Sequence, residues 1–416
     1  MIRRYRYNWL ILVQIFLIIA FCTPIMAYYL HGFVYFVPLL TGFFIFFAST
    51  ETFTPAFSIV IKSLRKNLIL FVMLLWYIAG IVLSHLRYAE NTLFLLGALL
   101  LPIFFFYGLF VNSKPQYHYI TVMLVVFCFF LNTLITGGDI SKDFTAKDVL
   151  LRAGTLANPI GSAGYWGSIG IFFPIFLANY KNIKKKYMRF GYIVVLVYLV
   201  YKLVFAGFAT PLGLLALNLV TIAMLYFVYH LKSLSQFLVS LILVIITIGS
   251  IYYFMNWLET TDLLGLNQIQ WRLLNIIEDP TSGGYTSHYI SRYDLFFVSF
   301  ETFMRFPIFG SGADLMTMAY VPLEIKCGGH SSFIDGLAIL GFFGGGGAMV
   351  YFFLKSLKNA ISKLKRRRSF EDICHTSVVS TLIIGGILNP YWMGSILILF
   401  LLMTRIYKIS PSNLKN

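Results

Sequence analysis

Long apolar segments alternate with short polar connections along almost the whole chain. A helix needs roughly 20 apolar residues to cross a bilayer, and twelve segments reach or approach this length. We expect spanning helices at 9–30, 33–50, 67–86, 92–111, 119–137, 161–180, 190–209, 211–230, 236–256, 331–354, 374–389 and 391–408. The pattern therefore predicts an all-α integral membrane protein whose residues 1–416 form a single polytopic domain.

Basic residues are concentrated in every second connection. The segments that this arrangement places on one side hold 23 of the 32 Lys and Arg residues. They are 1–8, 51–66, 112–118, 181–189, 231–235, 355–373 and the tail from Arg405. Because Lys and Arg accumulate in cytoplasmic loops, we expect both termini in the cytoplasm. The first apolar segment is long for a signal peptide and has no clean small-residue cleavage site, so we expect it to be retained.

Composition agrees with a membrane location. Only 12% of the 416 residues are charged, against about 25% in soluble domains. The net charge of +16 does not indicate nucleic-acid binding, because the basic residues lie in short loops rather than on one soluble face. The four cysteines are scattered, without a CxxC pair or a metal-binding spacing, so the sequence predicts neither a disulfide framework nor a metal site.

The largest insertion is the segment 257–330, which we expect outside the membrane between the ninth and tenth spans. Its stretch 293–306 is amphipathic, which is typical of a helix that lies at the membrane interface. The segment holds cations on the side where charge sorting disfavours them: Arg272, Arg292, Arg305, Lys326 and His330. Since a guanidinium binds phosphate oxygens in a bidentate manner, these residues indicate a phosphate-bearing ligand. For each cation, a solvated loop charge is the simpler alternative.

His330 directly follows two glycines and opens a predicted span. Its unperturbed pKa lets an imidazole act as a general base near neutral pH, and the alternative is a polar helix-start residue that faces water. Asp335 lies five residues later, which puts it about 140° away around a helix. We therefore do not expect Asp335 to orient His330, and we interpret it as a helix cap or part of a wet pocket.

The sequence from His330 onward resembles the signature of the O-antigen ligase and polymerase superfamily. That signature is His, then Asn, Ser or Gln, nine residues, Gly, two residues, and Gly, Thr or Tyr. His330, Ser331, Gly341 and Gly344 match it at the required spacing.

Two further segments are similar to the same family. In 291–312 an Arg opens an amphipathic helix that ends in Pro-x-x-Gly-x-Gly, at Pro307, Gly310 and Gly312. The stretch 158–170 resembles the start of an earlier family helix, which contains Asn and Gly.

One feature departs from the family. Members often carry Ser-Arg at the head of a mid-chain span, whereas this chain has Thr210-Pro211 there. Lys202, in the preceding helix, is the candidate substitute, because a lone Lys within an apolar span is a functional candidate by default.

The resemblance implies a GT-C-like membrane glycosyltransferase in the inner membrane of a bacterium, acting at its outer face on sugars carried by undecaprenyl diphosphate. In this reading His330 is the base, and Arg292, Arg272, Lys202, Arg305 and Lys326 are candidates for binding the diphosphate. We expect no metal and no cofactor in this chemistry, since no Asp-x-Asp motif occurs. A flippase and a chain-length regulator of the same pathway are the expected partners.

Three activities remain open on the sequence. The first is a Wzy-type polysaccharide polymerase, which moves a growing glycan onto the next lipid-linked repeat unit. The second is a ligase that moves finished glycan onto lipid A core or another acceptor, and the His signature does not separate it from the first. The third is a glycolipid transporter or flippase, which the lack of paired internal repeats disfavours.

Overall fold

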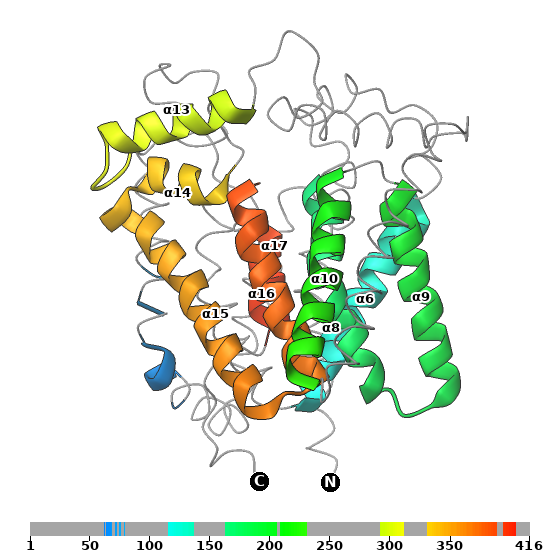
Figure 1. Cartoon of the computed structure of the whole chain (residues 1–416). Coiled ribbons are helices and arrows are strands. Elements are labelled where there is room, and N and C mark those ends of the chain that lie inside the picture. Colours follow the sequence, from blue (N-terminus) through cyan, green and yellow to red (C-terminus); the bar gives the residue numbers. More distant parts are fainter. Residues whose placement is uncertain are drawn as a thin grey trace, which may run out of the picture.

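The computed structural model describes residues 115–136, 163–205, 209–230, 292–311, 331–388 and 394–404, together with isolated helical positions between 62 and 79 (Figure 1). This part of the protein is entirely helical and contains no strand. The α-helices are α6 (Pro115–Thr136), α8 (Ala163–Asn179), α9 (Lys186–Phe205), α10 (Ala209–His230), α13 (Arg292–Arg305), α14 (Ser332–Leu340), α15 (Gly347–Arg367), α16 (Phe370–Leu388) and α17 (Gly394–Met403). Shorter helical turns are η3 (Tyr180–Asn182) and the π-helical η5 (Phe342–Gly346).

Several predicted spans coincide with helices to within a few residues. Helices α6, α8, α9, α10 and α16 correspond to the predicted spans at 119–137, 161–180, 190–209, 211–230 and 374–389. Two described helices, Thr210–Tyr229 and Phe370–Leu388, are long and apolar enough to cross a membrane. The predicted spans at 9–30, 33–50, 92–111 and 236–256 lie outside the described residues.

The predicted continuous span at 331–354 is wrong in one respect. The chain forms the short helix α14, breaks at Gly341, and continues through η5 into α15, which extends to Arg367. The break follows from the backbone of Gly341, whose φ of 65° and ψ of 174° are not helical. Such a conformation is accessible almost exclusively to glycine. In Figure 1, α15 runs down the bundle from the end where α14 lies.

The core is built where α8, α10 and α16 pack on one another. Pro174 lies inside α8 and has no N–H, so the carbonyl four residues earlier, that of Gly170, loses its helical hydrogen bond. The side-chain amide of Asn218 on α10 donates to Gly170 O at 2.9 Å and to Ile171 O at 3.0 Å. This amide therefore replaces the bond that Pro174 removes.

The side-chain oxygen of Asn218 bonds to the third helix, α16. Asn218 Oδ1 accepts hydrogen bonds from Ser377 Oγ at 2.7 Å and from Thr381 Oγ1 at 2.9 Å, both on α16. Asn218, Ser377 and Thr381 are each 0% exposed. Helix α8 approaches α10 closely here, because a Cβ at Gly170 would lie 2.6 Å from the Pro211 carbonyl oxygen. One buried amide thus joins α8, α10 and α16.

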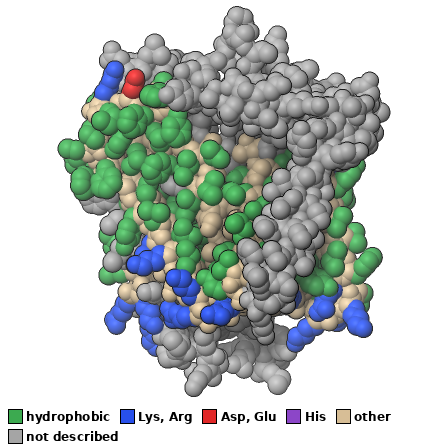
Figure 2. All heavy atoms as spheres, viewed as in Figure 1, with side chains coloured by type: hydrophobic (Ala, Val, Ile, Leu, Met, Phe, Trp, Pro, Cys, Tyr) green, Lys and Arg blue, Asp and Glu red, His purple; other side chains and the backbone are tan. Residues whose placement is uncertain are grey.

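The surface of the bundle has a polar end and an apolar side. Figure 2 shows Lys and Arg side chains gathered at one end, below a broad band of hydrophobic side chains. Exposed cations at the ends of α9 and α15 include Lys184, Lys185, Lys186, Arg366, Arg367 and Arg368. Large apolar side chains stay exposed along α9 and α10, among them Phe190, Val197, Met224 and Val228. An apolar surface of this extent is not typical of soluble monomers.

We predict that Asn218→Ala destabilises the protein by about 1–3 kcal/mol for each buried partner that it leaves without a hydrogen bond. In a Pro174→Ala background the restored N–H can bond to Gly170 O. The destabilisation caused by Asn218→Ala should then be smaller by about 1 kcal/mol than in the wild-type background. Thermal unfolding of the detergent-purified variants measures both values. Thr221→Ala is the matched control, because the Thr221 hydroxyl bonds only to Leu217 O of its own helix in the described contacts. Equal destabilisation in both backgrounds would contradict this role of Asn218.

Candidate functional site

Helix α13 lies across the end of the bundle opposite the basic end, next to α14 (Figure 1). Its most buried side chains are polar, since Ser299 is 0% and Thr302 1% exposed, and Phe303 packs beside them against the core. Its exposed side combines large apolar and charged side chains: Phe297, Phe300, Glu301, Met304 and Arg305. Such a mixed exposed side suits a helix that lies at a membrane interface. The helix that the sequence predicts at 293–306 is therefore present.

The turn that follows α13 is bonded to the break between α14 and α15. Phe342 N donates to Pro307 O at 2.8 Å, and Phe343 N donates to Ile308 O at 2.9 Å. On the other side of the break, Ser311 N donates to Ala338 O at 2.9 Å. The end of the Arg292 segment and the middle of the His330 segment thus share main-chain hydrogen bonds.

Two glycines permit this close approach. A Cβ at Gly310 would lie 2.2 Å from Ile339 O, and a Cβ at Gly341 would lie 2.3 Å from Gly310 N. Both residues also have positive φ, 74° at Gly310 and 65° at Gly341. Two of the family-like glycines are therefore required by one and the same contact, which the spacing within each motif did not reveal.

A buried carboxylate stabilises the start of α14. Asp335 is 1% exposed, and its Oδ2 accepts the Ser331 N–H at 2.9 Å. Its Oδ1 accepts the Ser299 hydroxyl of α13 at 2.5 Å. Ser331 is the N-cap of α14, and its Oγ accepts Ile334 N–H at 3.3 Å and donates to Gly386 O of α16 at 3.5 Å. The interpretation of Asp335 as a helix cap is confirmed, and the same carboxylate also attaches α13.

Comparison with models of known protein families gives no match to this chain, and comparison with curated proteins gives no significant match.

The remaining candidate residues are distributed as follows. Arg292 is the first residue of α13, and Arg305 lies in its last turn with an exposed side chain. Lys202 lies in the last turn of α9, with its Nζ 5.8 Å from the ring centroid of Tyr198. In Figure 1, α9 and α13 lie on opposite sides of the bundle. Candidates outside the described residues are Arg272, Gly312, Lys326 and His330, and Gly344 falls within η5.

Sequence reasoning missed Ser299 and the link from Asp335 to α13. The bond between Ser331 and Asp335 could have been predicted, because an acidic residue shortly after a Ser at a helix start is typical of a capping box. The spacing here is four residues, whereas a capping box has three. The bond between Ser299 and Asp335 could not be predicted from the sequence, since Ser299 lies 36 positions before Asp335.

We predict that Gly341→Ala destabilises the protein by about 3 kcal/mol or more, because the new Cβ meets main-chain atoms and the backbone is strained for any other residue. Thermal unfolding of the purified variant measures the effect. Gly336→Ala in α14 is the matched control, because a Cβ there has no atom within 4 Å, and it should be neutral or stabilising by up to about 1 kcal/mol. Wild-type stability of Gly341→Ala would show that the two segments do not depend on this contact.

Proposed function

We propose that this protein is an integral-membrane glycosyltransferase of the O-antigen ligase and polymerase superfamily, and that it polymerises a polysaccharide. The observation that carries the proposal is the main-chain contact between Pro307–Gly310 and Gly341–Phe343. Two segments resemble the family on independent residues, and their family-like glycines meet in one contact. The contact supports treating the two family-like motifs as parts of one site.

The proposed setting is the bacterial inner membrane, with twelve spans and cytoplasmic termini. The proposal is supported by the cations at one end of the bundle and by α13 and α14 at the other (Figures 1 and 2). Since cytoplasmic loops are rich in Lys and Arg, α13 then lies at the outer face. Its outward Phe297, Phe300 and Met304 side chains suit the membrane interface.

The outer face has no supply of nucleotide sugars, so the donor is a glycan linked to undecaprenyl diphosphate. A hydroxyl of the next lipid-linked repeat unit attacks the anomeric carbon of this donor. The bond from that carbon to the diphosphate oxygen breaks, and undecaprenyl diphosphate leaves with the bonding electrons. His330 takes the hydroxyl proton, and Arg292 and Arg272 bind the diphosphate as its charge develops.

The capped start of α14 supports the role given to His330. Ser331 follows His330 directly, and its N–H, hydroxyl and position are fixed by Asp335, Ile334 and Gly386. A catalytic base is most effective when the surrounding structure holds it in place. Asp335 is not expected to contact His330 itself; in this proposal Asp335 and Ser299 position it indirectly, by fixing the helix start at Ser331.

We predict that His330→Ala abolishes polymer while the protein still inserts into the membrane. Loss of a general base lowers the rate by about 10²–10⁴-fold, so traces of product are compatible with the role. Gel analysis of the glycans, together with the thermal stability of the purified variant, measures the outcome. Single repeat units should accumulate on the lipid carrier and appear on the final acceptor.

The same gel separates the polymerase from its alternatives. A ligase defect leaves long chains on the carrier, and a flippase defect leaves repeat units on the inner leaflet. Wild-type chain lengths in the His330→Ala strain would refute both the catalytic role and the polymerase.

The orientation can be tested separately. We predict that a reporter fused after Lys186 or after Arg368 is cytoplasmic, because both lie among clustered basic residues, and that one near Gly284 is external. Alkaline phosphatase and green fluorescent protein fusions measure the two locations. A cytoplasmic reporter at Gly284 would overturn the proposed membrane arrangement.

A further inference from the structure

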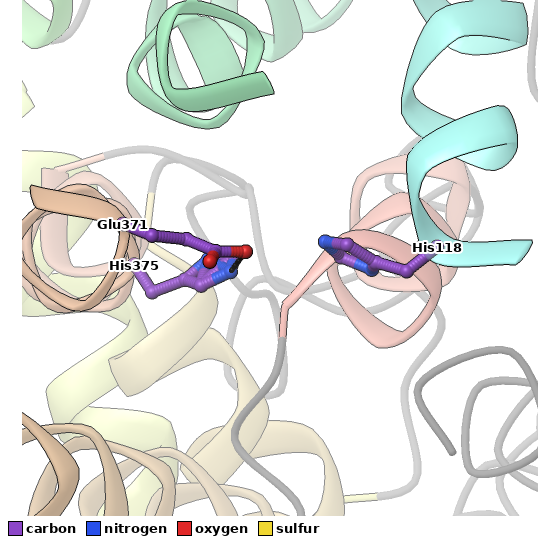
Figure 3. A group of neighbouring side chains, drawn as sticks. All are labelled: His118, Glu371 and His375. Atoms are coloured by element: carbon purple, nitrogen blue, oxygen red, sulfur yellow. Dashed lines mark ion pairs between the residues drawn. The ribbon is translucent and has the colours of Figure 1, made fainter. Parts of the chain in front are cut away.

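Three side chains from two helices meet at the basic end of the bundle. His118 lies in the first turn of α6, and Glu371 and His375 lie one turn apart near the start of α16. One ligand atom of each residue lies within 4.8 Å of the other two. Figure 3 shows Glu371 and His375 projecting from α16 toward the ring of His118 on α6.

We propose that His118, Glu371 and His375 bind one divalent transition-metal ion, with Zn²⁺ as the expected ion. Two imidazoles and one carboxylate form a ligand set that zinc prefers, whereas Mg²⁺ and Ca²⁺ prefer oxygen ligands. Three protein ligands leave the fourth tetrahedral position for water.

The distances are close to those of a metal site. Two ligand atoms about 2.0–2.1 Å from a tetrahedral zinc ion lie roughly 3.4 Å from each other. His375 Nε2 and Glu371 Oε1 are 4.0 Å apart. This pair therefore needs to close by about 0.6 Å, and the largest closure that the three ligand atoms need is about 1.4 Å, since all lie within 4.8 Å of one another. Side-chain rotations can provide movements of this size. The spacing of Glu371 and His375 by four residues already aligns them on one face of α16.

Burial also fits a bound ion. His118 and His375 are 3% and 5% exposed, and their rings meet edge to face with centroids 5.7 Å apart. The Glu371 side chain remains 36% exposed, so water can reach the open ligand position. The carboxylate also offsets part of the charge of the ion, next to Lys181, whose Nζ lies 4.8 Å from the ring centroid of Phe370, the residue before Glu371.

The site is separate from the proposed catalytic end. Glu371 is near one end of α16, and Gly386, which accepts the Ser331 hydroxyl, is near the other. Fifteen residues of helix place them roughly 22 Å apart. The metal would therefore act as a cross-link between α6 and α16, both of which pack on α8. This inference does not depend on the glycosyltransferase proposal.

The first test uses the wild-type protein, purified in detergent without chelator. We expect about one zinc ion per chain by mass spectrometry of the metal content, and a lower melting temperature after removal of the metal, because a ligand that binds only the folded state stabilises it. Added Co²⁺ should give the visible absorption of a tetrahedral nitrogen and oxygen site. A wild-type protein with neither bound zinc, nor a cobalt spectrum, nor a zinc-dependent shift would overturn the proposal, and the cluster would then be only an aromatic and ion-pair contact.

The second test uses variants that lose one ligand each. His118→Gln, His375→Gln and Glu371→Gln should each weaken Co²⁺ binding by more than about 100-fold, since even loss of an outer-shell partner costs 10–100-fold. Glu301→Gln is the matched control, because Glu301 is an exposed carboxylate on α13, and it should bind metal as the wild type does. Unchanged metal binding in all three ligand variants would also overturn the proposal.

Discussion

The packing of α8, α10 and α16 depends on how the carbonyl of Gly170 obtains its hydrogen bond. Pro174 removes its partner, and the site is closed to solvent, since Asn218 beside it is 0% exposed. Asn218 supplies the missing donor from α10 and uses its own carbonyl oxygen to accept hydroxyls from α16. Because one side chain satisfies groups on two other helices, the relative position of α8, α10 and α16 is defined by hydrogen bonds rather than by apolar contact alone.

The candidate site is attached to this core through α16. The carbonyl of Gly386, toward the far end of α16, accepts the Ser331 hydroxyl, which holds the start of α14. Asp335 then joins α14 to α13 through Ser299, and the Gly310–Gly341 contact joins them a second time. Burial of the Ser299 hydroxyl costs little on α13, because it bonds to the Asp335 carboxylate.

The helices were largely predictable, whereas their breaks and contacts were not. The apolar runs predict the ends of α8 and α10 to within two residues, because the length and apolar composition of a helix can be read directly from the sequence. The same reading gives 331–354 as one span, since Gly341 and the glycines after it do not interrupt the apolar pattern. The backbone angle of Gly341 depends on what packs against it, and that is the distant turn at Gly310. The His118 and Glu371 pair was equally unreadable, because more than 250 positions separate them.

The length of α13 distinguishes its two arginines. Arg292 and Arg305 are its first and last residues, and thirteen residues of helix correspond to about 20 Å. Two residues so far apart along one helix are not neighbours at one diphosphate, so at most one of them belongs to the proposed anion site. Arg305 has an exposed side chain and lies in the last turn, where a cation is already favoured by the helix dipole. Its position therefore has a local explanation that needs no ligand. A cation at the first residue of a helix opposes the dipole, so the dipole does not account for Arg292, whereas the proposed anionic ligand would.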